Sequence, residues 1–157
     1  MKYDAVVFDL DGTLIDTLED LMDSVNYALA EFGFPARTYE EIRTFVGNGV
    51  RRLVYLSVPE GTPDDVSEKC LDVFKAHYLH NSRTKTKPYK GIPELLKAIF
   101  AAGFKTAVVT NKMQDAAVDI VRGLFRRQHP CYHRSGRRRG AEARAGRRFG
   151  LRSTSSA

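Results

Sequence analysis

The spacing of hydrophobic residues changes from strand-like to helical early in the chain. Ala5 to Phe8 form a short apolar run of the length expected for a buried strand. After a polar break at Asp16-Thr17, apolar residues recur at three- and four-residue steps, as on one face of a helix. These residues are Leu18, Leu21, Met22, Val25, Leu29 and Phe32. Gly33 and Pro35 then favour a helix end, so the pattern predicts a strand followed by a helix.

A second helix is expected to begin at Thr38. The threonine side chain can cap the first turn, and Glu40 and Glu41 are acids placed near the positive end of the helix dipole. The sequence Gly47-Asn48-Gly49 ends this helix, because glycine and asparagine favour turns. Two further helices are predicted over 50–58 and 63–80. The stretch 16–82 is therefore expected to form a helical cap over the end of the first strand.

The alternation of strand and helix returns after a polar loop at 81–90. A helix is predicted over 92–102, a buried strand over 104–109 and a further helix over 114–125. Residues 1–15 and 83–125 are accordingly expected to form an α/β core around the inserted cap. Residues 126–157 continue neither pattern, because no apolar run among them is long enough for a buried strand.

The first strand ends in the most informative residues of the chain, Asp9-Leu10-Asp11-Gly12-Thr13. A strand at this place puts both aspartates at the carboxyl edge of a parallel sheet, where open α/β folds bind ligands. Two crowded carboxylates repel each other unless a cation lies between them, and a hard oxygen site of this kind suits Mg²⁺. Gly12 permits the sharp turn out of the strand. The alternative interpretation is an ordinary polar turn.

Residues 4–13 resemble the first motif of the haloacid dehalogenase-like hydrolases, in the phosphatase branch that has the second aspartate. The resemblance implies that Asp9 is the nucleophile, which forms an aspartyl-phosphate, and that Asp11 is the general acid and base. It also implies a Mg²⁺ cofactor held by Asp9 and Asp11. This chemistry is consistent with a carboxylate as phosphoryl acceptor beside a second carboxyl that alternates between acid and base.

Residues 89–112 resemble the cap-exit helix and second motif of phosphoglycolate phosphatase-like members of this family. The resemblance implies that the Thr110 hydroxyl and the Asn111 backbone N–H hold phosphoryl oxygens, although Thr-Asn is also common in strand-end turns. In the cap, the loop 47–49 matches the glycine-bearing loop over the substrate. Arg43, Arg51 and Arg52 either meet a substrate carboxylate or are solvated. Lys112 either meets phosphate or is solvated, and the solvated interpretation is favoured.

The family implies a Rossmann-like, doubly wound parallel sheet, here incomplete, with an inserted α-helical cap. The implied function is Mg²⁺-dependent hydrolysis of a small phosphate monoester, with 2-phosphoglycolate as a candidate. A sugar-phosphate mutase of the same family uses the same first motif and is an alternative. Cys70 and Cys131 provide no disulfide framework, and neither a signal peptide nor a membrane-spanning run is recognised. We therefore expect a cytoplasmic enzyme without a membrane partner.

Charge separates the last part of the chain from the rest. The net charge of the whole sequence is +6. Residues 126–157 hold ten arginines and one acid, a charge of +9, whereas residues 1–125 carry a net −3. The basic tail contains no lysine and no aspartate. The resemblance therefore ends near residue 125, before the lysine motif and the acidic strand end that the family uses.

A frameshift would explain this tail. Reading the codons of 141–146 from the second base permits Arg-Lys-Pro-Ala-Pro-Asp, the form that the missing third motif takes. The same frame at 131–134 permits Val-Ile-Ile-Gly, the strand and glycine expected upstream. We therefore hypothesise a frameshift between about Arg122 and Gln128.

The tail has two other interpretations. His129, Cys131 and His133 are spaced like metal ligands, but a zinc site normally has a fourth. The arginines can contact nucleic-acid phosphates, but no aromatic platform accompanies them, so no specific nucleic-acid partner is expected. We expect poor stability, a tail disordered from about residue 127 and negligible turnover. The remaining alternative is an inactive remnant that binds phosphate esters.

Overall fold

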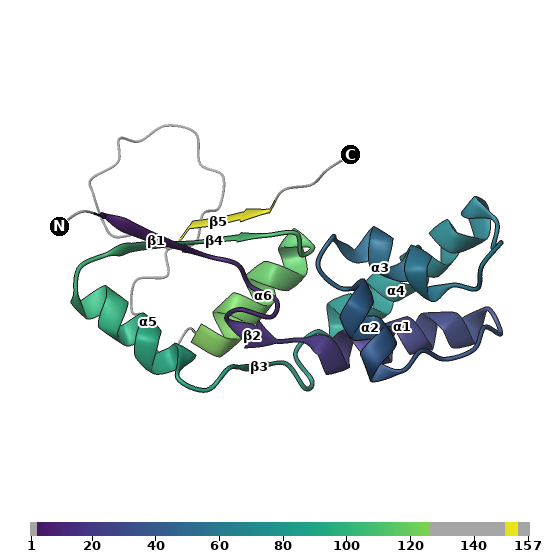
Figure 1. Ribbon diagram of the computed structural model, residues 1–157, viewed down its shortest axis with the longest axis horizontal. Helices are drawn as coiled ribbons and strands as arrows, with labels where there is room; N and C mark the ends of the chain where they lie inside the picture. Colours follow the sequence, from purple (N-terminus) through teal and green to yellow (C-terminus); the bar gives the residue numbers. More distant parts are fainter. Residues whose placement is uncertain (1–2, 126–149, 154–157) are drawn as a thin grey trace.

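A parallel sheet forms the centre of the α/β part in the computed structural model, which describes residues 3–125 and 150–153 (Figure 1). Its strands are β1 (Ala5–Phe8), β4 (Lys105–Thr110) and β5 (Gly150–Ser153), in the order β1-β4-β5. β1 pairs with β4 in a register that puts Phe8 opposite Val108. Because both strands run in the same direction, their carboxyl ends lie at the same edge of the sheet.

Helices α5 (Ile92–Ala101) and α6 (Gln114–Phe125) cover one face of this sheet (Figure 1). Side chains on a strand alternate between faces, so Thr106 and Val108 are buried while Val109 is exposed. The buried cluster beneath the sheet comprises Leu10, Leu14, Ile15, Leu96, Val108, Ala117, Ile120, Val121 and Phe125. On the opposite face Val7 is 62% exposed and Val109 is 43% exposed, so the two faces differ sharply in burial.

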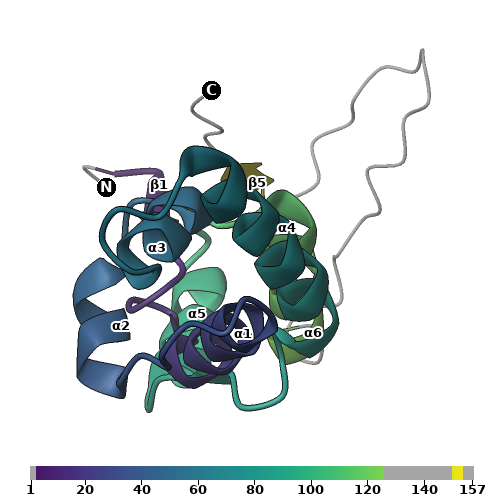
Figure 2. The same cartoon turned by 90° about the vertical axis from the view of Figure 1, so that its right-hand side faces the viewer.

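Four helices form the cap: α1 (Leu18–Glu31), α2 (Tyr39–Phe45), α3 (Val50–Ser57) and α4 (Asp64–Asn81). Figure 2 views the molecule from this side, with the cap helices in front of the α/β part. They enclose a separate buried cluster that comprises Leu21, Val25, Ala28, Leu29, Ile42, Leu53, Val54, Val58, Cys70, Leu71, Phe74, Tyr78 and, from α6, Ala116. The cap therefore buries its apolar faces largely against itself.

The two connections between the parts are held together. The short strands β2 (Ile15–Asp16) and β3 (Lys87–Pro88) pair antiparallel where the chain enters and leaves the cap. Asp20, only 2% exposed, accepts hydrogen bonds from the backbone N–H groups of Lys85 and Thr86 at 2.9 and 2.8 Å. Its carboxylate also accepts the Thr86 hydroxyl at 2.7 Å. These bonds satisfy a buried charge and fix the exit segment against α1.

Most of the predicted elements are confirmed. The α/β fold class with its helical cap and parallel sheet agrees with the structure, and each predicted helix is present to within a few residues of its expected ends. Thr38 caps α2 in a reciprocal capping box with Glu41. The pairs β2 and β3 were not predicted, because two residues are too few for a periodic signal.

The prediction of a tail disordered from about residue 127 is wrong at residues 150–153. Residues 150–153 form β5, which pairs with β4 and places Gly150 opposite Ala107. Strand pairing uses backbone N–H and C=O groups, so it does not require the apolar run that the prediction looked for. The rest of the tail expected to be disordered, the ligand-like residues His129, Cys131 and His133, and residues 126–128 of the segment in which a frameshift is hypothesised lie outside the described residues. Within those residues, no helix combines the length and apolar character needed to cross a membrane.

Candidate functional site

The end of β1 presents two carboxylates on a tightly held loop. Asp9 directly follows the strand and is exposed, whereas Asp11 is half-buried. The side chains of Leu10 and Leu14 are fully buried and anchor the loop between them. Gly12 has φ of 74°, a left-handed conformation that favours glycine, and its N–H donates to the carbonyl of Ile15 at 3.0 Å. The loop thus holds both aspartates at the carboxyl edge of the sheet.

The end of β4 brings a second set of polar groups to the same edge. Thr110 is the last residue of the strand and is 4% exposed. Its hydroxyl accepts a hydrogen bond from the backbone N–H of Lys112 at 3.2 Å. Asn111, between them, is exposed and donates through Nδ2 to the carbonyl of Gly47 in the cap at 3.1 Å. The parallel pairing of β1 and β4 is what brings these residues beside Asp9.

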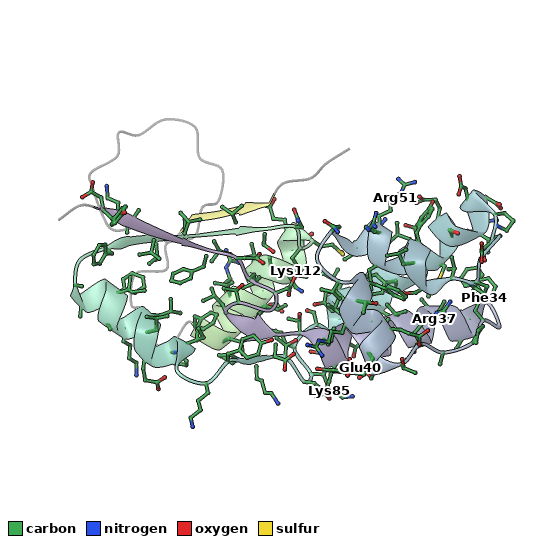
Figure 3. The ribbon with its side chains drawn as sticks, in the orientation of Figure 1. Phe34, Arg37, Glu40, Arg51, Lys85 and Lys112 are labelled. Carbon is green, nitrogen blue, oxygen red and sulfur yellow. The ribbon has the colours of Figure 1, made fainter. Side chains whose placement is uncertain are left out.

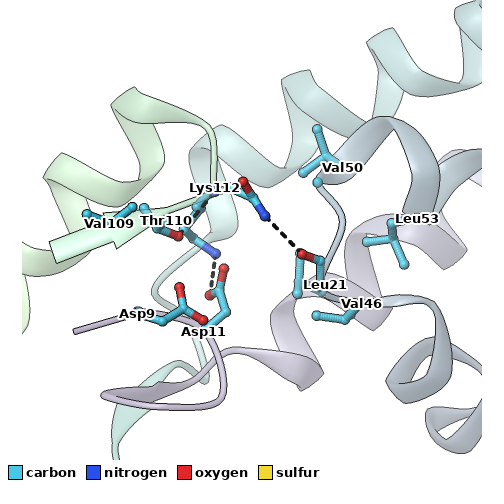
Figure 4. A pocket seen from close by; sticks show the side chains of 12 residues that line it. Asp9, Asp11, Leu21, Val46, Val50, Leu53, Val109, Thr110 and Lys112 are labelled. Atoms are coloured by element: carbon cyan, nitrogen blue, oxygen red, sulfur yellow. Dashed lines mark hydrogen bonds and ion pairs between the residues drawn. The ribbon is translucent and has the colours of Figure 1, made fainter. Parts of the chain in front are cut away.

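A cavity of about 290 Å³ lies between these strand ends and the cap (Figure 4). Its residues come from both parts of the molecule: Asp9, Asp11, Leu21, Val46, Gly47, Gly49, Val50, Leu53, Val109, Thr110, Asn111 and Lys112. The α/β side of the cavity is polar apart from Val109, and the cap side consists of leucine, valine and glycine. The four predicted catalytic and phosphate-binding residues, Asp9, Asp11, Thr110 and Asn111, all line this cavity.

Asp11 accepts two hydrogen bonds on one carboxylate oxygen. Its Oδ1 accepts a hydrogen bond from the hydroxyl of Thr17 at 2.8 Å and from the ammonium of Lys112 at 2.8 Å. Thr17 is 4% exposed, so the first of these bonds joins the carboxylate to the entrance of the cap. Two donors on one oxygen hold the orientation of this carboxylate.

Lys112 is buried, so the prediction of a solvated lysine is wrong. It is 5% exposed, and its ammonium lies 4.9 Å from the ring centroid of Tyr78 in α4, a cation–π contact. Figure 3 shows Lys112 at the boundary between the two parts of the molecule. The lysine was misjudged because its neighbours Tyr78 and Asp11 are distant in sequence and meet it only in the folded chain.

The phenol of Tyr78 is strongly affected by the same surroundings. The side chain is fully buried, and its burial, reinforced by the negative charges of Asp11 and Asp20, raises the pKa of the phenol far above its ordinary value. Tyr78 therefore stays neutral, and its contribution beside Lys112 is the face of its ring.

The cap contributes no cation to the cavity. Arg43 pairs with Glu40 and Arg51 pairs with Glu68, and both arginines are about 70% exposed. Arg51 lies at the outer rim of the cap, away from Lys112 (Figure 3). Arg52 is also exposed, and the cavity lining includes none of the three. Of the two interpretations left open by the sequence, solvated arginines agree with the structure.

The donor set at the sheet edge suits a hard divalent cation. Asp9 and Asp11 supply two carboxylates, and Mg²⁺ is commonly held by one or two carboxylates together with phosphate oxygens and water. The described residues contain no group of three or more histidine, cysteine, aspartate or glutamate side chains placed to hold a metal by themselves. These residues therefore fit Mg²⁺ bound jointly with a phosphorylated ligand.

Comparison with known proteins agrees with this arrangement. The model of the haloacid dehalogenase-like hydrolase family matches residues 6–125, which confirms the predicted end of the resemblance. A phosphoglycolate phosphatase from Aquifex aeolicus (strain VF5) is 37% identical over 116 residues, covering 74% of this chain and 53% of the relative. One from Mesorhizobium japonicum is 36% identical over 132 residues, covering 82% of this chain and 58% of the relative.

A crystal structure from Lactobacillus delbrueckii subsp. bulgaricus, whose name places it among the phosphoglycolate phosphatases, has a TM-score of 0.77 and 29% sequence identity. It matches 99% of this chain, which in turn covers 66% of that structure. The chain spans little more than half the length of the two curated relatives. The family match over most of the described residues and the relatives above 30% identity lead to one conclusion: the chain belongs to the haloacid dehalogenase-like hydrolases.

Proposed function

We propose that this chain carries the reaction centre of a Mg²⁺-dependent phosphomonoester hydrolase that acts on a small phosphorylated metabolite. The observation that supports it best is the meeting of Asp9, Asp11 and Thr110 at one cavity on the carboxyl edge of the sheet. The relatives named phosphoglycolate phosphatases make 2-phosphoglycolate the first substrate to test.

Asp9 is the proposed nucleophile. It is exposed beside the cavity, so its carboxylate can approach a phosphorus atom without displacing a protein partner. One of its oxygens forms a bond to phosphorus as the bond to the ester oxygen breaks, giving an aspartyl-phosphate and an alcohol. Water then attacks the same phosphorus and releases inorganic phosphate, which restores the carboxylate.

Asp11 is the proposed proton carrier for both steps. In its protonated form it gives a proton to the departing ester oxygen, and as a carboxylate it takes one from the attacking water. The bonds from Thr17 and Lys112 to Oδ1 hold the group in place while its other oxygen serves the reaction. Thr110 and Asn111 are the proposed binding groups for phosphoryl oxygens.

Asp9 and Asp11 would hold the Mg²⁺ ion, and the bound ion would offset negative charge on the transferring phosphoryl group. The cap supplies an apolar wall of Leu21, Val46 and Val50 opposite the polar strand ends. Its hydrogen bond between Asn111 and Gly47 holds the wall close to the reaction centre. Excluding bulk water in this way strengthens the electrostatic interactions inside.

The experiment measures phosphate release from 2-phosphoglycolate and from p-nitrophenyl phosphate by the full chain with Mg²⁺, beside its Asp9→Asn variant. We expect slow release, well below that of the Aquifex aeolicus enzyme, because residues 126–157 contain neither lysine nor aspartate. Asp9→Asn should reduce this release on the order of a thousandfold, as for loss of other nucleophiles. Equal release by the two proteins would contradict the proposal.

A second candidate is phosphate-ester binding without turnover, which the absence of lysine and aspartate from residues 126–157 favours. Saturable binding of 2-phosphoglycolate by the full chain, with no release above that of Asp9→Asn, would establish this alternative.

A further inference from the structure

The cavity contains a cation that the proposed reaction does not yet use as a ligand for substrate. Among the described residues that line the cavity, Lys112 alone has a positively charged side chain. Its side chain is 2% exposed, far less than the surface lysines of the same chain, such as Lys69 at 66%. A phosphate monoester brings about two negative charges into a space already lined by Asp9 and Asp11, so this cation matters for binding.

Burial of an ammonium is costly unless its charge and its N–H groups are satisfied. The described residues stabilise the charge of the Lys112 ammonium and accept one of its three N–H groups. One N–H donates to Asp11, and the ring of Tyr78 stabilises the charge from another side. An ammonium has three donors, and the hydrogen bond to Asp11 is the one that the described residues provide. Two N–H groups are therefore available to an anion.

The position of this ammonium matches the place of the phosphoryl group in the proposed reaction. Figure 4 shows it between Thr110 on one side and Asp9 and Asp11 on the other. The backbone N–H of Lys112 donates to the Thr110 hydroxyl. The strand end that is proposed to bind phosphoryl oxygens therefore also fixes the backbone position of the lysine. Lys112 thus reaches the cavity from the loop that follows β4, on the same side as the proposed phosphate-binding residues.

We propose that Lys112 is a phosphoryl-binding residue, with Asp11 and the phosphoryl group competing for its ammonium; this assignment rests on the proposed function of the cavity. In the ligand-free chain the ammonium is the counter-ion of Asp11. When a phosphoryl group enters, its oxygens accept the two remaining N–H groups. The competition predicts opposite effects at the two residues: loss of Lys112 weakens anion binding, and loss of the Asp11 charge strengthens it.

Calorimetric titration of the full chain with inorganic phosphate tests this assignment. EDTA is present so that no divalent ion supplies the positive charge. Lys112→Met should weaken binding about tenfold or more, the usual effect of losing a charge-assisted hydrogen bond. The matched control is Lys97→Met, which removes the same charge from an exposed position on α5 outside the cavity lining and should leave the dissociation constant within about twofold.

Asp11→Asn provides the second measurement. It removes a like charge from the cavity and frees the ammonium, so phosphate binding should tighten about threefold or more. Circular dichroism verifies that each variant is folded. If Lys112→Met does not fold, Asp11→Asn still decides, because unchanged or weaker binding by that variant would overturn the assignment.

Two further outcomes also overturn it: phosphate binding by Lys112→Met that equals the wild type, or no phosphate binding by the wild type. The result is separable from the fate of the proposed function. Loss of binding in Lys112→Met supports the lysine assignment even if no ester is hydrolysed. Conversely, hydrolysis that depends on Asp9 supports the phosphatase even if Lys112→Met binds phosphate normally.

Discussion

The cap and the α/β part satisfy their hydrophobic residues in different ways. The cap has a buried cluster to which its four helices contribute every residue except Val58, which directly follows α3, and Ala116 of α6. The sheet is packed on one face by α5 and α6, while Val7 and Val109 are exposed on the other. Parallel sheets are normally covered on both faces. Helices adjacent in sequence can therefore bury their apolar side chains against one another, whereas a parallel sheet needs segments from far along the chain to cover its two faces.

The candidate site lies where these two parts meet and is lined by residues from both. The carboxylates and Thr110 belong to the sheet, but the wall opposite them and the ring beside Lys112 belong to the cap. Asp20 joins the parts through a segment 65 residues away in sequence. The site therefore depends on the better-packed part to hold the groups of the other in place.

The largest expected effect comes from truncating the centre of each cluster. Phe74→Ala in the cap should lower the free energy of unfolding by about 3–5 kcal/mol, and Leu96→Ala in the α/β part by about 2–5 kcal/mol, because each leaves a cavity among fully packed neighbours. Urea unfolding measures the change in the free energy of unfolding of each variant, and hydrogen exchange shows which backbone amides lose protection. We expect Phe74→Ala to expose amides of α1 and α4 first, and Leu96→Ala those of β4.

The same pattern of lost protection in both variants would contradict this difference between the cap and the α/β part, because it would show that the two parts unfold as one unit. The control is Leu79→Ala, which truncates a side chain at a 43% exposed position on α4. It should change the free energy of unfolding by much less than either buried truncation.

A smaller effect of opposite sign is expected at two buried hydroxyls, one in each part. Within the described residues, Tyr78 Oη in the cap and Thr106 Oγ1 in β4 are buried without a hydrogen-bond partner. Tyr78→Phe and Thr106→Val remove the unpaired group and keep nearly the same shape, so each should raise the free energy of unfolding by about 1 kcal/mol. Urea unfolding measures both. A loss of stability in either variant would reveal a partner for that hydroxyl.

The smallest effect concerns the pH dependence of the α2 terminus. Hydrogen bonds from the backbone and side chain of Thr38 lower the pKa of Glu41 below its ordinary value of 4.5, with a further contribution from Arg37. The folded pKa is depressed, so this stabilisation is present above pH 4.5 and is lost as pH falls through the folded pKa. The Glu41 side chain is exposed, so the effect is small.

Thermal unfolding of the wild type and Glu41→Gln tests this dependence. The wild type should melt at the higher temperature at pH 7, and the difference should shrink on acidification below pH 4.5. The exposed Glu40→Gln, whose partner Arg43 is also largely exposed, is the matched control. A difference between wild type and Glu41→Gln that is constant from pH 7 to pH 3 would contradict the assignment to this carboxyl.

Local sequence patterns were enough to predict the helices and strands and the polar groups at their ends. The helical spacing of 18–32 and the apolar run before Asp9 are local patterns, and burial follows from them because each needs one apolar face. The meeting of Asp9 with Thr110 was also predictable, since the carboxyl ends of parallel strands share an edge. Hydrophobic periodicity and strand direction are properties of the local sequence, so they carry this information before tertiary contacts form.

Which polar groups are buried, and what those groups contact, depends on the folded arrangement of the elements. The sequence favours a solvated Lys112, yet in the fold its ammonium contacts the ring of Tyr78 and the carboxylate of Asp11. Asp20 reads as an ordinary helix acid, yet it binds the exit segment, and β5 pairs through its backbone without an apolar run. Each depends on residues tens of positions apart. Local sequence patterns encode which face of an element is apolar, but the burial of a charge depends on the groups that folding brings around it.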